Sequence, residues 1–186
     1  METLVPAFVA VLLAQLVDRP AWLAAVLGDR YGPRGVLAGT ALAQGAGFAL
    51  AAWAGALLAP AINPNARTLL LALALLAAGG GSMLRPRLSD RLERWRIGGF
   101  GTALFGIFIL AFGDRSQFLV LAFAWGANPL LAAAGATAAA VAVASGAVVL
   151  GERGWRGWPH RPMRIGISAL FLLSGAVLAL KALGLL

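Results

Sequence analysis

Six apolar stretches divide the chain, and short polar segments separate them. The stretches cover residues 3–27, 35–61, 67–84, 99–125, 130–151 and 164–186. Each is long enough for the roughly 20 apolar residues that a membrane-spanning helix needs. The 186 residues and the short loops leave no room for a soluble domain. The pattern predicts an all-α polytopic membrane protein with six transmembrane helices.

Charged residues interrupt two of these stretches at a depth where charge is unfavourable. Asp18, Arg19 and Pro20 interrupt the first, and Asp114 and Arg115 form a polar island in the fourth, which otherwise reads as one long helix. On insertion scales each such charge costs about 2.5–3.5 kcal/mol. These side chains therefore need a partner, a hydrated cavity or a function. Pro20 also predicts a kink in the first helix.

The two interruptions indicate an internal repeat. Asp18 and Asp114 lie 96 positions apart, and the same offset pairs Arg19 with Arg115 and Gly39 with Gly135. With three helices per half, the second half must enter the membrane from the opposite side. Inverted repeats with an interrupted helix in each half are typical of secondary transporters, whose site lies near the bilayer midplane at the repeat interface. We expect a first repeat over 1–84, a cytoplasmic basic linker over 85–98 and a second repeat over 99–186.

Basic residues predict the orientation of the chain. Of the 15 Lys and Arg residues, 11 lie in the loops after the first, third and fifth stretches. The positive-inside rule then places these loops in the cytoplasm and both termini on the other side. Within the linker, Leu88, Leu92 and Trp95 lie at helical spacing, so that a surface amphipathic helix and a solvated basic loop are equally compatible with it. The composition suits a bacterial inner membrane.

Several classes of function are excluded. The chain has no Cys, which removes disulfides and thiolate metal sites. Its net charge of +8 is distributed as a topology signal and not as an aromatic-bearing basic surface, so nucleic acid is not an expected partner. No histidine, cysteine or activated hydroxyl lies at membrane depth, which argues against an enzyme, and no cofactor is expected. The single histidine, His160, is typical of a surface loop residue.

These residues resemble a known family. Two polar motifs of the form Glu-x-Gly-Asp-(Lys/Arg)-(Thr/Ser), one in each half of a six-helix chain, are similar to those of the transmembrane protein 165 (Gdt-type) cation transporters of the lysine-exporter superfamily. The second motif matches from Gly113 to Ser116, and Gln117 follows it; the first matches at Asp18 and Arg19. The resemblance implies manganese or calcium transport, with protons as the exchanged ion, and Asp18 and Asp114 as metal ligands.

Departures from the motif weaken the expected site. Gln15 and Ala111 stand where the family has glutamates. Four carboxylates are thereby reduced to two, and hard cations bind best to charged oxygens. Arg19 and Arg115 would bring the four intramembrane charges to zero. We expect each arginine to pair across the repeat or with backbone carbonyls, and not with the aspartate next to it in the chain. Neutral oxygens complete the candidate transport site, from Gln15, Ser116, Gln117 and, if it turns toward Asp18, Gln44.

Three hypotheses follow from the sequence. The first is a secondary transporter that moves a small inorganic cation in exchange for protons, with Asp18 and Asp114 as ligands or proton carriers. The second is a non-transporting accessory or assembly subunit in which the Asp/Arg pairs fix helix register. The third is an exporter of a small zwitterionic solute. A homo-oligomer in the bilayer is compatible with each of them.

Overall fold

The regular secondary structure of the described residues is helical throughout. The computed structural model describes residues 2–83, 97–126 and 128–185. The expected basic linker with Leu88, Leu92 and Trp95 lies outside these residues. The elements, in order, are α1 (Leu4–Gln15), α2 (Arg19–Tyr31), α3 (Pro33–Leu58), η1 (Ala59–Ala61), α4 (Pro64–Met83), α5 (Gly98–Ala111), α6 (Arg115–Phe123), α7 (Pro129–Gly157) and α8 (His160–Ala182).

Two of the expected spanning helices are broken. The axes of α1 and α2 differ by 68°, and those of α5 and α6 by 74°. Asp18 and Asp114 are the N-cap residues of α2 and α6, and Pro20 occupies the first turn of α2, where a missing N–H is tolerated. The prediction of one continuous helix over 99–125 is wrong. Gly113 adopts a φ of 73° there, which ends the helical path, and the chain restarts at Arg115.

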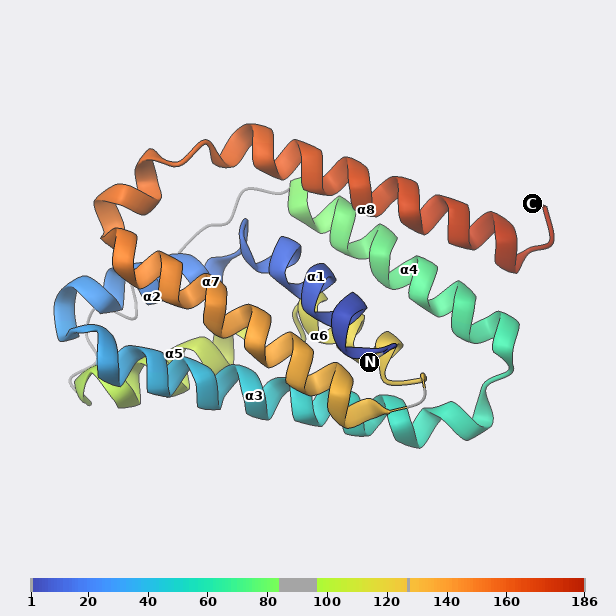
Figure 1. Ribbon diagram of the computed structural model, residues 1–186, viewed down its shortest axis with the longest axis horizontal. Helices are drawn as coiled ribbons and strands as arrows, with labels where there is room; N and C mark the ends of the chain where they lie inside the picture. The colour runs from blue at the N-terminus through green and yellow to red at the C-terminus, as the bar shows by residue number, and fades with distance from the viewer. Residues whose placement is uncertain (1, 84–96, 127, 186) are drawn as a thin grey trace.

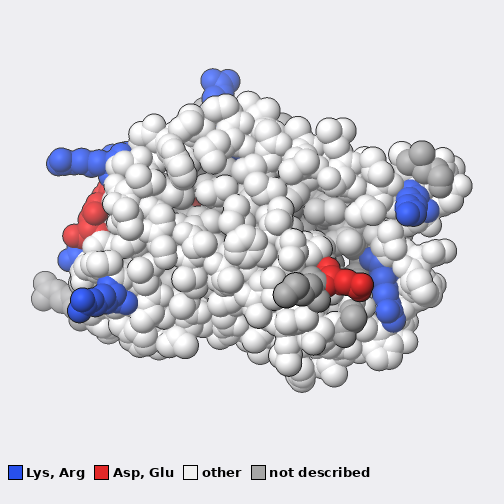
Figure 2. Space-filling view, viewed as in Figure 1, with Lys and Arg blue, Asp and Glu red and all other residues white. Residues whose placement is uncertain are grey.

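The helices have the length and apolarity of a multi-pass membrane protein, as the sequence predicts. Within the described residues, α3 with η1, α7 and α8 could each cross a membrane, and the two bent pairs raise the number of candidate spans to five. The remaining expected span, the third in chain order at 67–84, coincides with the 20-residue α4, which is not among these candidates. Charged side chains gather mostly toward the ends of the long axis on the face that Figure 2 shows, and much of the middle is uncharged.

Helix contacts relate the first four helices to the last four. α1 packs on α7 as α5 packs on α3, and α2 packs on α7 as α6 packs on α3. α4 and α8 pack on each other, as do α3 and α7. Figure 1 shows that each counterpart runs in the opposite direction, for example α3 against α7 and α4 against α8. This arrangement is an inverted repeat; the exact repeat boundaries remain a prediction.

Close backbone approaches follow the 96-residue offset. A Cβ on Gly39 would lie 2.5 Å from the carbonyl oxygen of Phe100, and one on Gly135 would meet the carbonyl oxygen of Leu4 at similarly short range. Both pairs of positions, 39 with 135 and 4 with 100, are 96 residues apart. Small residues allow membrane helices to approach closely. The two halves therefore use glycine at equivalent crossings.

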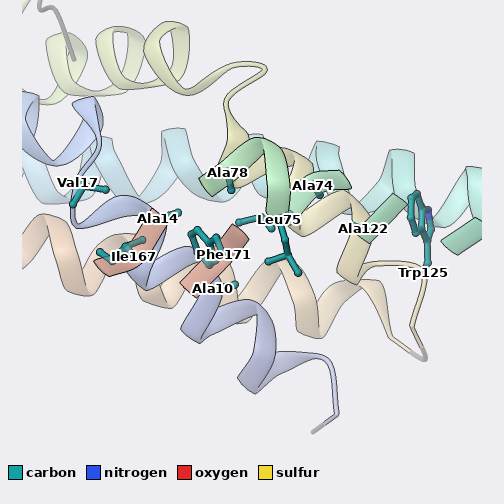
Figure 3. Close-up of a cluster of buried hydrophobic side chains, with 11 residues drawn as sticks. Ala10, Ala14, Val17, Ala74, Leu75, Ala78, Ala122, Trp125, Ile167 and Phe171 are labelled. Carbon is teal, nitrogen blue, oxygen red and sulfur yellow. The ribbon is translucent and has the colours of Figure 1, made fainter. Parts of the chain in front are cut away.

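A buried cluster of apolar side chains lies beside the breaks. It joins Ala14 of α1, Leu75 of α4 and Leu119 of α6 with Ile167 and Phe171 of α8. Figure 3 shows Phe171 between the α1 and α4 residues of this cluster. The packing holds the ends of α1 and α6 against α4 and α8, and so positions the polar residues that follow α1 and precede α6.

Candidate cation site

An ion pair joins the two breaks. Nη2 of Arg115 lies 3.1 Å from Oδ1 of Asp18, and its Nε donates to Oδ2 of Asp18 at 3.3 Å. The two side chains are only 13% and 7% exposed. Such a two-point contact fixes both groups and strengthens the pair. The expected pairing across the repeat is therefore present for Arg115.

Ser82 completes the coordination of this arginine. Its Oγ accepts a hydrogen bond from Nη1 of Arg115 at 3.1 Å and donates to the carbonyl of Ala78 at 2.7 Å. Ser82 is 1% exposed. The sequence analysis did not select it, although a hydroxyl in an otherwise apolar span, directly after three glycines, is a signal that could have found it. Arg115 thus connects α6 to both α2 and α4.

The two aspartates are held differently. The backbone N–H of Arg19 donates to Oδ1 of Asp18 at 2.8 Å, so this carboxylate caps α2. Asp114 occupies the same position at α6 but makes no capping hydrogen bond with its side chain. Asp18 lies near enough to act electrostatically on the carboxyl group of Asp114. The buried Oδ2 of Asp114 has no hydrogen-bond partner among the described residues. Two adjacent carboxylates repel each other unless a positive group or a proton lies between them.

Neutral polar groups lie buried without partners. Three of them in the described part of the chain belong to residues of the expected site: Nε2 of Gln15, Oε1 of Gln44 and Oγ of Ser116, and each of these residues is at most 2% exposed. A buried polar atom that lacks a hydrogen bond is unfavourable unless a ligand or water satisfies it. Gln117 is used differently, because its Oε1 accepts from the N–H of Gly113 at 2.9 Å. This hydrogen bond stabilises the break between α5 and α6, so the Oε1 atom of Gln117 is already in use as an acceptor.

Arg19 does not enter the site. Its side chain is exposed and makes no hydrogen bond or ion pair within the described ranges. It lines a cavity of about 260 Å³ with Asp18 and with Trp22, Trp155 and His160. His160 is half-buried, and its Nε2 lies 2.5 Å from the carbonyl of Trp155. The central charges are therefore two carboxylates and one guanidinium, which sum to −1 and not to the expected zero.

The donor set suits a cation that enters and leaves. No group of three or more His, Cys, Asp or Glu side chains converges within residues 2–83, 97–126 and 128–185. Two carboxylates, one of them bound to an arginine, and a few neutral oxygens form a weaker set than the sites that retain hard cations permanently.

Comparisons with known proteins place this geometry in context. The family model of the divalent cation/proton antiporter GDT1 matches residues 3–91 and, separately, residues 99–185. The two matched segments correspond to the two halves that the helix contacts relate. No individual curated protein and no solved structure is similar enough to the chain to give a match.

Proposed function

Since the chain belongs to the GDT1 family of divalent cation/proton antiporters, we propose that Asp18 and Asp114 form the centre at which its cation and protons exchange. It is a multi-pass membrane transporter and not an enzyme. The observation that carries the proposal is that an aspartate stands at the helix break of each half, and that Asp18 of the first half is bound by Arg115 of the second. A secondary transporter needs groups that accept either a cation or protons, and carboxylates do both.

Arg115 acts as an internal counter-ion in this proposal. It neutralises Asp18 while neither substrate is bound, since an uncompensated buried carboxylate pair would be costly. The free Oδ2 of Asp114 and the hydroxyl of Ser116 are then the first ligands available to an entering cation. Binding at both carboxylates requires Arg115 to release at least one of its contacts with Asp18. Protons compete for the same oxygens, which couples the two fluxes.

We propose Mn²⁺ or Ca²⁺ as the cation, by the resemblance of the Gly113–Ser116 motif. Both ions prefer charged and neutral oxygen ligands, of the kind that Asp18, Asp114 and Ser116 carry. Because positions 15 and 111 hold Gln and Ala, the affinity should be low for either ion. The expected orientation places both termini outside the cytoplasm, in a cell membrane of bacterial inner-membrane type.

A flux assay tests the proposal. Purified protein is reconstituted into liposomes that contain a Mn²⁺- or Ca²⁺-sensitive dye and a pH-sensitive dye. Wild type is compared with Asp18→Asn and Asp114→Asn. We expect coupled cation and proton fluxes in wild type and their loss in both variants, because each change removes a ligand and a proton carrier. Glu152→Gln is the matched control, since the carboxylate of Glu152 pairs with the exposed Arg156 and has no other ion pair within the described residues.

A second function has its own supporting observation. Asp18 is already satisfied by Arg115 and by the N–H of Arg19, as a purely structural ion pair would be. An accessory protein without transport would show no flux for any cation in wild type. It would also lose thermal stability in Asp18→Asn, whose amide leaves Arg115 without its counter-charge. Flux in wild type excludes this alternative.

A further inference from the structure

The cavity beside Asp18 has a cationic mouth. Arg19 from the first turn of α2 and Arg164 from the first turns of α8 line it, together with His160 at the start of α8. Its walls include Trp22 and Trp155. Two helix N-termini, each with positive dipole character, therefore open onto one cavity of about 260 Å³. Such an arrangement repels a divalent cation and attracts an anion.

The two arginines of this mouth have no ion-pair partner among the described residues. Neither Arg19 nor Arg164 has a side-chain hydrogen bond or ion pair in the part of the chain that the structure describes. Asp18, the acidic residue of the lining, is already bound to Arg115 and caps α2. The nearby Arg156 stacks over the ring of Trp22 with its guanidinium 5.4 Å from the centroid, and it is paired with Glu152. Among the described residues, Asp18 is thus the one acidic group of the lining, and its carboxylate is already engaged.

A second hollow extends the same surface along α8. It has a volume of about 80 Å³, shares Arg164 with the first cavity and adds Arg161 and Ser168. Ser168 is 1% exposed, and its buried Oγ has no hydrogen-bond partner within the described residues. A hydroxyl donor and two guanidinium groups around one small hollow match the oxygens of a phosphate group. The unsatisfied hydroxyl is an observation independent of the charges.

We propose that this mouth binds the headgroup of an anionic phospholipid. The phosphate would lie at Arg164, which both hollows share, with Arg19 in the first hollow on one side and Ser168 in the second hollow on the other. Ile165, 55% exposed, and Trp158, 40% exposed, continue the surface next to it and suit acyl chains and the headgroup boundary. Basic pockets between transmembrane helices are known to hold acidic headgroups. The exposed apolar residues favour a phospholipid over a free anion.

The lipid would also change access to Asp18. Without an anion, Arg19 and Arg164 oppose the entry of a divalent cation by this route, and a bound phosphate cancels that repulsion. This consequence depends on the proposed cation transport, whereas lipid binding does not. The two are therefore measured separately.

Binding is tested on the full chain in nanodiscs of phosphatidylcholine with and without phosphatidylglycerol. We expect phosphatidylglycerol to raise the midpoint temperature of unfolding of wild type. In Arg19→Gln and in Arg164→Gln the lipid should bind about fivefold more weakly, because each such charge contributes roughly 1 kcal/mol near an acidic headgroup. Arg153→Gln is the control, because Arg153 is exposed on α7 at the same end of the molecule and does not line the cavity. Inorganic phosphate added to phosphatidylcholine nanodiscs forms a third arm.

Three outcomes overturn the proposal. The first is the absence of a phosphatidylglycerol effect on wild type. The second is an equal loss of binding in Arg153→Gln, which would indicate a general response to bilayer charge. The third is a rise in the thermal midpoint with inorganic phosphate as large as the rise with phosphatidylglycerol, which would assign the site to a free anion. A flux assay in the same two lipid compositions then reports transport, and a failure of flux with intact lipid binding rejects the cation proposal alone.

Discussion

Both helix breaks place an aspartate at the N-cap of the helix that follows, but the charged side chains at the two breaks have different partners. At the first break, Asp18 caps α2 and accepts an ion pair, while the adjacent Arg19 is exposed. At the second, Asp114 caps nothing with its side chain, while the adjacent Arg115 turns inward. Each half therefore contributes one group to the central pair: the carboxylate of the first and the guanidinium of the second. A symmetric sequence signal has produced an asymmetric site.

The packing around the breaks differs in the same sense. α4 packs on α6, where Ser82 holds Arg115, but the equivalent pair α8 and α2 has no comparable contact in the described residues. The cavity lined by Arg19 and Arg164 lies there instead. The interface between α4 and α6, which we call the closed seam, is packed, whereas the equivalent interface between α2 and α8 is open. Such a difference is expected for a single state of an inverted-repeat transporter. The difference teaches that the two arginines, although equivalent in sequence, have distinct roles in this state.

The largest expected effect comes from comparing these arginines. Arg115→Met leaves two neighbouring carboxylates without their counter-ion, and we expect the free energy of unfolding to fall by about 3–5 kcal/mol. Arg19→Met removes an exposed side chain and should change it by no more than about 0.5 kcal/mol. Unfolding in mixed micelles measures both. Equal losses in the two variants would show that the asymmetry between the breaks is not energetic.

The glycine crossings should behave symmetrically, in contrast to the arginines. A Cβ at position 39 or 135 meets a backbone carbonyl that cannot move aside easily. We expect Gly39→Ala and Gly135→Ala each to lower the unfolding free energy by about 1–3 kcal/mol, in the same assay. Gly146→Ala is the control, since nothing lies within 4 Å of its added Cβ. A large effect at only one of the two crossings would break the repeat relation in the packing.

The smallest expected effect concerns the closed seam. Ser82→Ala removes the hydroxyl that accepts from Arg115, and a hydrogen bond of this kind contributes about 1–1.5 kcal/mol to the unfolding free energy. Ser145→Ala is its match, because Ser145 donates only to the carbonyl of Val141 in its own helix. If both serines give the same small loss, Ser82 does not position Arg115. The same variants in the flux assay would show whether the seam also affects exchange.

Much of the fold could be predicted because it depends on local composition. Apolar length predicts the helices, and the 96-residue offset predicts which glycines cross a partner helix. The break at Pro20 was predictable because proline cannot continue a helix. The break at Gly113 was missed, since a single glycine in an apolar stretch is also tolerated in helices. In the structure its positive φ goes with a hydrogen bond from its N–H to Oε1 of Gln117, which its place in the sequence alone did not indicate.

The sequence by itself determined the class of the molecule, its internal repeat and the two aspartates that stand at equivalent positions of its halves. These follow from hydropathy and from residues that are costly at membrane depth wherever they occur. Only the tertiary structure decided which arginine enters the site, that Ser82 receives it, and that Arg19 lines a cavity with His160 and Arg164. Ion pairs between residues far apart in the chain depend on side-chain direction and on which helix seam is closed. Two positions with the same sequence motif can therefore take opposite places in one folded state.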